Sequence, residues 1–460
     1  MNANQISRKQ RHRFLVRRAI RRLLKREIVP GRVMILAALL GAMIGFVCVV
    51  FQLLPELIAI YRLEWFAGSE GSPGDYFLLF VSSGLLAAFA LFLTFRFAPE
   101  AGGSGIPEIE GALDRKRPVR WWRVLPVKLV GGMASLSSGM ILGREGPSIQ
   151  IGGNLGKMGA DLALLPKRHS MALLAAGGAA GLAAAFNAPL AGLLFVLEEL
   201  RPQFRYSFLS VNIVAVTVVT AAMIRCCILS SDPVFAGLPV FATPEPASYV
   251  WFVVLGCAAG VFGVCFNRMI GFFQDLYLRI HSGKLMRALL LIFLVGGMFG
   301  ILSVAVPDAA GSGMMSIPSW IGSHVALPTL AALLAARTAG IMLCFCSGIP
   351  GGIFAPSLAI GTILGAILGT ALETAGLPWA PETGILAITG MCAIFAASVR
   401  APVTGIVLAT EMTNNYQFLL PMMITTLTAT IVAQKLGGMP IYTQILNRTL
   451  RLAAQRRSRG

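Results

Sequence analysis

Charged residues are scarce in this sequence. Asp, Glu, Lys and Arg make up 13% of the 460 residues, whereas a soluble protein averages about 25%. Hydrophobic residues make up 56%, and the mean hydropathy is +0.76. Runs such as 33–54 and 76–95 reach the roughly 20 residues that a helix needs to cross a bilayer core. About eleven such runs occur, several of them interrupted by Gly or Pro. The chain is therefore predicted to be an all-α, polytopic membrane protein.

The side chains that build catalytic centres are few or unsuitably spaced. The four histidines are scattered, and the eight cysteines fall within or beside apolar segments, where a free Cys behaves as a small hydrophobic residue. The Gly-rich stretch 152–158 lacks the four-residue gap of a phosphate-binding loop and ends in Met. We therefore expect a protein that is not an enzyme and that uses no cofactor and no metal.

Acidic residues are nearly absent from both ends of the chain, which are strongly basic. Residues 1–32 hold eleven Lys and Arg and one Glu, and residues 443–460 hold five Arg and no acid. Basic flanks beside transmembrane segments mark the cytoplasmic side. We expect both termini to be cytoplasmic and the first segment to contact anionic lipid. No nucleic-acid partner is expected, because aromatic residues are not interleaved with the basic ones. The first 32 residues lack the apolar core of a cleavable signal peptide.

An internal repeat divides the membrane part of the chain. Residues 138–156 and 347–365 align without gaps, and both read S-G-x-x-x-G-x-x-[GA]-P-S-x-x-I-G-x-x-L-G. Two further pairs of blocks recur in the same order, 103–111 with 311–319 and 188–199 with 401–412. The predicted organisation is a basic segment 1–32, a first membrane repeat 33–230, a linker 231–248, a second repeat 249–442 and a basic tail 443–460.

The alignment of the repeats separates symmetric charges from asymmetric ones. Lys128 and Arg337 each lie ten residues before the leading Ser of the longest block, and Glu198 is equivalent to Glu411. We interpret the two glutamates as structural, as caps or as partners of an Arg such as Arg201. Glu199 stands opposite a methionine in the second repeat, so it suits a role that occurs once per pathway. Intramembrane carboxylates are costly and point to function.

Three clusters combine Gly with Pro, namely GSGIPE (103–108), GREGP (143–147) and GGIFAP (351–356). Pro fits the first turn of a helix, and the unpaired N–H groups of that turn form an anion site. Broken helices at matching places in two membrane repeats are typical of transporters. The alternative is that the glycines only allow close helix packing. We expect three helices that begin inside the membrane around an anion, with Ser104 offering a hydroxyl and Ile353 and Phe354 offering N–H groups.

These motifs, together with the late tyrosine in GGMPIYTQIL, resemble those of the CLC family of chloride channels and transporters. The resemblance covers residues 33 to 450, and RWWRVLPVK (120–128) and FNAPLAG (186–192) are similar to the enterobacterial chloride/proton exchangers. It implies a CLC-type fold of tilted and broken helices in two inverted-topology repeats. It also implies a homodimer in the bacterial inner membrane, with one pathway in each subunit.

The resemblance further implies roles for single residues. Ser104 would coordinate the central chloride through its hydroxyl, with Tyr442 on the cytoplasmic side of the ion and backbone N–H groups from Ile353 and Phe354. Glu145 would be the gating glutamate that faces the outside. Ionised, it would occupy an anion position; protonated, it would swing away and admit chloride.

Glu199 would be the internal glutamate that takes protons from the cytoplasm. The expected function is thus secondary active exchange of chloride for protons. The principal alternative is a passive CLC-type chloride channel, which typically lacks a carboxylate at the inner proton position. A structural ion pair between Glu145 and Arg144 is the other interpretation of GREGP, although adjacent residues on a helix do not face each other.

Overall fold

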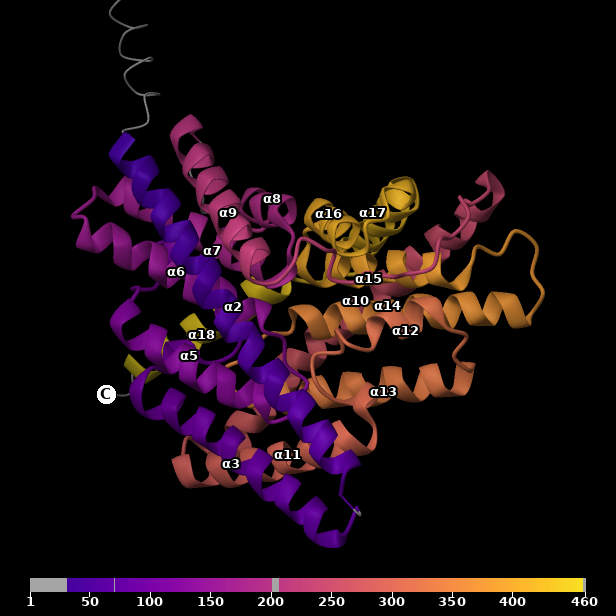
Figure 1. Ribbon diagram of the computed structural model, residues 1–460, viewed down its shortest axis with the longest axis horizontal. Coiled ribbons are helices and arrows are strands. Elements are labelled where there is room, and N and C mark those ends of the chain that lie inside the picture. The colour runs from indigo at the N-terminus through magenta and orange to yellow at the C-terminus, as the bar shows by residue number, and fades with distance from the viewer. Residues whose placement is uncertain (1–30, 70, 201–206, 458–460) are drawn as a thin grey trace, which may run out of the picture.

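The computed structural model describes residues 31–69, 71–200 and 207–457, and every regular element in these ranges is a helix (Figure 1). The first half of the chain forms α2 (Gly31–Ala67), α3 (Pro73–Phe97), α4 (Ile106–Leu113), α5 (Trp121–Ser137), α6 (Glu145–Leu162), α7 (Lys167–Phe186), α8 (Pro189–Glu198) and α9 (Phe208–Ile228). The second half forms α10 (Tyr249–His281), α11 (Leu285–Ala305), α12 (Ile317–Gly322), α13 (Leu327–Phe345), α14 (Phe354–Thr374), α15 (Thr383–Val399), α16 (Pro402–Thr413), α17 (Leu419–Lys435) and α18 (Ile441–Arg457).

The hydrophobic pattern is that of a membrane protein. Within the described ranges, nine helices are long and apolar enough to cross a bilayer, and α8 and α15 are shorter apolar helices. Large apolar side chains are exposed along the outer helices, for example Ile35 and Leu39 of α2 at 64% and Phe77 of α3 at 69%. Exposed apolar side chains of this number suit contact with lipid. The prediction of an all-α polytopic membrane protein is confirmed.

The two halves of the chain repeat the same series of helices. In each half two long helices are followed by a short 3-10 turn, Pro99–Ala101 or Pro307–Ala309, and then by a short helix, α4 or α12. The packing repeats as well, because α6 lies on α7 as α14 lies on α15, and α2 lies on α9 as α10 lies on α17. Figure 1 shows most of the first half, indigo to magenta, beside most of the second, orange to yellow, whereas α11 lies against α3 and α18 lies among the helices of the first half.

Equivalent elements of the two halves meet in an antiparallel way. Glu411, near the end of α16, accepts hydrogen bonds from the backbone N–H groups of Leu190 and Ala191 at the start of α8, at 3.0 and 2.8 Å. In return Glu198, at the end of α8, accepts N–H bonds from Val403 and Thr404 at the start of α16, at 3.0 and 2.7 Å. Each helix therefore begins where the other ends. This reciprocity is that of inverted repeats, and it confirms that both glutamates are caps.

Close helix packing accounts for many of the glycines. A side-chain carbon on Gly152 or Gly156 of α6 would overlap the backbone of α7, and one on Gly361 or Gly365 of α14 would overlap the backbone of α15. Small residues let helices approach closely where lipid supplies no hydrophobic drive. For these glycines the packing interpretation holds. The α6–α7 and α14–α15 pairs that they allow are the most extensive helix contacts in the described structure.

Some expectations concern residues outside the described ranges. The lipid contact expected for the basic N-terminal segment falls almost wholly on residues 1–30, and the proposed partner Arg201 lies in 201–206. At the other end, α18 carries Tyr442 and continues to Arg457 as one helix. The expected boundary between 442 and 443 thus falls inside a helix that belongs to the membrane body at its start and to the basic tail at its end.

The reciprocal caps generate a first prediction. Glu411→Ala removes the acceptor for two N–H groups at the start of α8, and loss of an N-terminal cap costs about 0.5–2 kcal/mol. We expect a lower midpoint of thermal unfolding in detergent, measured by loss of the monodisperse peak in size-exclusion chromatography. Glu245→Ala, at an exposed position in the linker, is the matched control. An equal midpoint for the two variants would contradict the structural importance of the cap.

Candidate functional site

Three helices begin at one place in the interior, as the Gly and Pro clusters predict. They are α4 at Ile106, α6 at Glu145 and α14 at Phe354. The loops that lead into them are joined by backbone hydrogen bonds. Gly143 and Gly352 exchange two N–H···O bonds of 2.7 Å, and Gly103 donates to Ile349 at 3.0 Å and accepts from Gly351 at 3.1 Å. The positive ends of the three helices are therefore held together.

Two buried cations hold the loops that precede the short helices. Lys128 of α5 donates to the carbonyl oxygens of Ala101 and Gly103, at 2.9 and 2.6 Å. Arg337 of α13 donates to the carbonyls of Asp308 and Gly311, at 2.6 and 3.0 Å. Both side chains have an exposed fraction of 0%. Both side chains donate their hydrogen bonds to backbone carbonyl oxygens. Lys128 and Arg337 therefore hold the loops in place and do not offer a free charge to a passing anion.

Two hydroxyl groups lie buried at this centre without a hydrogen-bond partner in the described part of the chain. They belong to Ser104, in the loop before α4, and Tyr442, on the first turn of α18, with exposed fractions of 2% and 0%. The two hydroxyls lie near enough for one to bond to the other, and such a bond would still leave one hydroxyl proton without an acceptor. Buried hydroxyls are nearly always hydrogen-bonded. An anion accepting from both would supply a partner for each.

The carboxylate of Glu145 lies against the N-terminus of α14. Its Oε2 accepts the backbone N–H of Ala355 at 3.3 Å, its Oε1 has no partner among the described residues, and the side chain is 0% exposed. An N–H group of the first helical turn has no partner within its own helix. Glu145 thus occupies a position that suits an anion. The Ala355 donor was not among the predicted residues, although the pattern GGIFAP places it in the same turn.

The remaining backbone donors lie next to that contact. Ile353 is the N-terminal cap residue of α14 and Phe354 is its first residue. The ring of Phe354 packs between Phe186 and Phe395, with centroid distances of 5.1 and 4.3 Å. The apolar rings exclude water from the first turn of the helix, which strengthens the interaction of its N–H groups with a negative charge.

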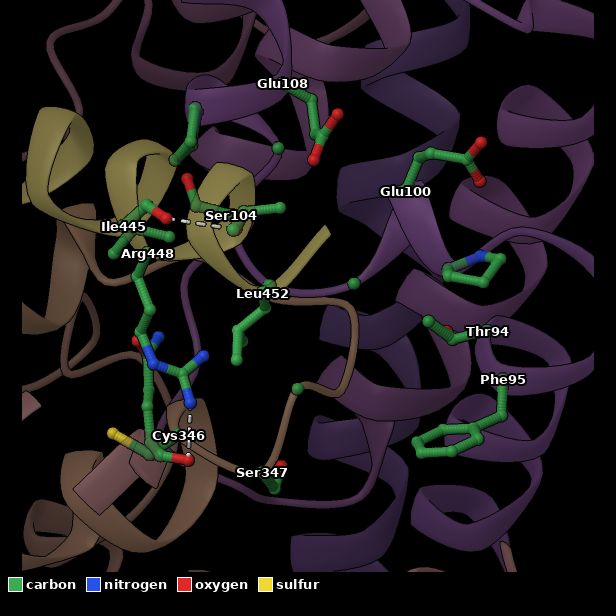
Figure 2. Close-up of a pocket in the computed structure, with 18 of the residues that line it drawn as sticks. Thr94, Phe95, Glu100, Ser104, Glu108, Cys346, Ser347, Ile445, Arg448 and Leu452 are labelled. Carbon is green, nitrogen blue, oxygen red and sulfur yellow. Dashed lines mark hydrogen bonds between the residues drawn. The ribbon is translucent and has the colours of Figure 1, made fainter. Parts of the chain in front are cut away.

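A large cavity leads away from Ser104 on one side of the molecule. It has a volume of about 790 Å³ and is lined by the end of α3, the loop 99–105, the end of α10 and one face of α18. Figure 2 shows Ser104 at the inner part of this cavity, with Ile445, Arg448 and Leu452 of α18 on one wall and Thr94 and Phe95 of α3 on the other. Its charged lining is mainly basic, from Arg117, Arg120, Arg123 and Arg448.

A smaller cavity, of about 180 Å³, lies towards the opposite membrane surface. It is bordered by the end of α2 and by Arg144, whereas the large cavity is bordered by the end of α3. Since α3 returns across the membrane after α2, the two cavities open towards opposite sides. Of the two neighbours of Glu145 in the chain, Arg144 lines the small cavity and Gly146 lies against Ser104, which lines the large one. The buried carboxylate of Glu145 therefore lies between the two cavities.

The second candidate carboxylate, Glu199, lies at the C-terminal end of α8 and is partly buried. It interacts electrostatically with Glu110 and with Tyr442. Glu110 of α4 is only 4% exposed and accepts a hydrogen bond of 3.0 Å from Thr443 of α18. This carboxylate is buried because α18 packs against α4 and covers it.

Arg144 does not bond to the neighbouring glutamate. Its Nη1 forms an ion pair with Glu56 of α2. The interpretation of GREGP as an ion pair between Glu145 and Arg144 is therefore wrong, because Arg144 pairs with Glu56 instead. Sequence reasoning missed Glu56, which lies 88 positions before the arginine. Its acidic charge, directly after the predicted apolar run 33–54, was the signal that could have identified it.

Comparison with known proteins gives a consistent result. The family model described as voltage gated chloride channel matches residues 86–434. The H⁺/Cl⁻ exchange transporter ClcA of Vibrio parahaemolyticus is 48% identical over 437 residues, with 94% of this chain and 93% of the relative covered. The ClcA protein of Citrobacter koseri is 46% identical, with 94% and 91% covered. A crystal structure of a slow cyanobacterial Cl⁻/H⁺ antiporter is similar with a TM-score of 0.87 and 36% identity, over 92% of this chain and 99% of that one.

The position of Gly146 generates a prediction for this site. A side-chain carbon there would overlap the hydroxyl of Ser104, so Gly146→Ala must displace the serine. Overpacking costs about 1–3 kcal/mol, and about 1.4 kcal/mol is tenfold in affinity. We expect chloride binding weakened roughly tenfold in isothermal titration calorimetry.

The matched control is Gly178→Ala on α7, where the added carbon would meet Ile149 at an ordinary 3.5 Å. It should bind chloride as the unmodified protein does. If both variants kept the original affinity, the anion would have to be bound elsewhere.

Proposed function

The chain belongs to the voltage gated chloride channel family, and from this premise we propose that it is a secondary active antiporter that exchanges chloride for protons. Relatives at 46–48% identity over more than nine-tenths of the chain are named H⁺/Cl⁻ exchange transporters. The similar cyanobacterial structure is also a Cl⁻/H⁺ antiporter. The proposal therefore has support from sequence and from fold, and the site supplies a physical mechanism for it.

One observation carries the mechanism. The carboxylate of Glu145 is buried between two cavities on opposite sides and accepts an N–H bond from the first turn of α14. A carboxylate in an anion position competes with chloride for it. Protonation removes the charge and thereby the attraction to the N–H groups, so the side chain can leave and a chloride can enter. A proton and a chloride thus act on one site in opposite senses, which couples their movements.

We infer that chloride is held by weak donors rather than by a fixed cation. Hydroxyls of Ser104 and Tyr442 would bind it from the side of the large cavity, and N–H groups of Ile353 and Phe354 from the start of α14. The nearest buried cation, Lys128, already donates to two carbonyl oxygens. Binding by dipoles is favourable enough for entry and weak enough for release, which turnover requires.

Glu199 is proposed as the inner proton acceptor. Its position at the end of α8, its electrostatic interaction with Tyr442 and the absence of a symmetric carboxylate in the second repeat support this role. A proton would travel between Glu199 and Glu145 past the chloride site, and chloride would use the large cavity. A passive channel would need no carboxylate at this position.

The sidedness follows from charge. Arginines line the large cavity, and the last helix, α18, carries the basic tail, so we infer from the positive-inside rule that this cavity opens to the cytoplasm. Both termini are then cytoplasmic, and the small cavity with Arg144 faces outward. We propose the bacterial inner membrane as the location, in contact with lipid, and a homodimer as the working form with one pathway in each subunit.

Liposome fluxes test the exchange and separate the two glutamates. Uphill proton movement driven by a chloride gradient is expected for the unmodified protein. In Glu145→Gln the gate is permanently neutral, so chloride should pass at any pH and proton coupling should vanish. In Glu199→Gln proton movement should also vanish, while chloride flux keeps a dependence on pH through Glu145. The double variant should behave as Glu145→Gln alone.

Parallel chloride and pH electrodes measure both fluxes, and Glu373→Gln, at an exposed position on α14, is the control. Chloride flux of the unmodified protein without any proton movement would identify a passive channel. Normal proton coupling in either single variant would refute the role of that residue. A loss of pH dependence in Glu199→Gln rather than in Glu145→Gln would mean that the two roles are reversed.

Anion selectivity gives a separate prediction for Ser104. Ser104→Pro and Ser104→Ala both remove the hydroxyl that would donate to the central anion, so chloride should lose its preference over nitrate while the protein still folds. The control is Ser312→Ala, the equivalent serine of the other repeat, which lines the small cavity. The chloride-to-nitrate flux ratio is the measurement. A ratio unchanged in both Ser104 variants would place anion recognition elsewhere.

A further inference from the structure

An acidic side chain outside the proposed transport residues lies next to the gate. Glu56 of α2 forms an ion pair with Arg144, the residue that precedes Glu145 in the chain. The Glu56 side chain is 40% exposed, and that of Arg144 is 13% exposed. Both line the small outer cavity, where Glu56 is the one carboxylate among the described lining residues. Glu56 is thus accessible from the outside, whereas Glu145 is buried.

The other charged groups near Glu56 are arginines that bind the backbone. Arg62, on α2 itself, donates to the carbonyl of Ser137 at 2.6 Å and to the hydroxyl of Ser303 at 3.5 Å. Arg225, on the neighbouring α9, donates to the carbonyl of Ser230 at 2.8 Å and is in electrostatic contact with both Glu56 and Arg144. Neither arginine competes for the carboxylate of Glu56 in a direct ion pair within the described ranges.

Arg144 depends on Glu56 for charge compensation. Its Nε is buried and has no hydrogen-bond partner in the described chain, and Glu56 is the carboxylate with which it pairs. Arg144 and Glu56 both act on Glu145 through space, with opposite signs. Tyr442 of α18 also interacts electrostatically with Glu145. From the side of the small cavity, Glu145 therefore experiences a cation, Arg144, and an acid, Glu56, that opposes part of its effect.

We propose that Glu56 is a positioning residue that sets the pH at which Glu145 opens the anion path. Its negative charge holds the guanidinium of Arg144 at the outer cavity and weakens the attraction of Arg144 for the gate. Without that charge, Arg144 would stabilise the ionised form of Glu145 at the N-terminus of α14. The gate would then stay in the anion position until a more acidic pH. This inference rests on the proposed role of Glu145.

The experiment is chloride flux from liposomes with equal pH inside and outside, varied from acid to neutral. In Glu56→Gln the midpoint of the flux profile should fall by on the order of one pH unit, since an adjacent opposite charge shifts a carboxyl titration by about 1–3 units and Glu56 is partly exposed to solvent. Glu56→Asp, which keeps the charge on a shorter side chain, should restore most of the original midpoint.

The matched control is Glu64→Gln, an exposed acid eight positions further along α2, which should leave the profile unchanged. In the Glu145→Gln background the Glu56 substitution should have no effect on pH dependence. If Glu145→Gln lost its pH dependence while Glu56→Gln kept the original midpoint, the role of Glu56 would be overturned and the gate would stand. If Glu145→Gln alone kept its pH dependence, the proposed gate itself would fail.

Discussion

The arrangement of this protein depends on bringing the positive ends of three helices together inside a membrane. Two hydrogen bonds between Gly143 and Gly352, with the bridge from Gly103 to residues 349–351, fix the loops that lead into α4, α6 and α14. Peptide dipoles supply the positive potential. The full cations that lie close by, Lys128 and Arg337, are bound to carbonyl oxygens of the loops. Among the described residues, the proposed anion site therefore contains no free cation that would trap the anion.

The inverted repeats bring the starts of equivalent helices together at the centre of the protein. An antiparallel meeting of equivalent segments, at Gly143 with Gly352 and at α8 with α16, places two helix starts from opposite directions at the same depth. The two repeats differ at the positions of the two proposed proton-carrying glutamates. Glu145 is equivalent to Phe354, and Glu199 to Met412. One repeat therefore supplies the titratable groups, while the other supplies the N–H groups and the aromatic packing around them.

The proposed gate, Glu145, lies between the dry interior of the protein and the small outer cavity. Its carboxylate contacts the N–H of Ala355 in the dry interior, and the preceding arginine reaches an outer cavity and pairs with Glu56. Electrostatic interactions weaken steeply in water and persist in the interior. A charge at the edge of the outer cavity can therefore adjust the gate without contacting the anion, which is the basis of the role inferred for Glu56.

The sequence by itself determined the membrane class, the two repeats, the three helix starts and the symmetric caps Glu198 and Glu411, because length, periodicity and Gly–Pro chemistry act between neighbours in the chain. It did not determine that Arg144 pairs with Glu56, that Ala355 donates to Glu145, or that Thr443 of α18 covers Glu110. These contacts join residues about 90 to 330 positions apart. Only the packing of whole helices brings such side chains within bonding distance, because local sequence does not encode which distant helix lies alongside.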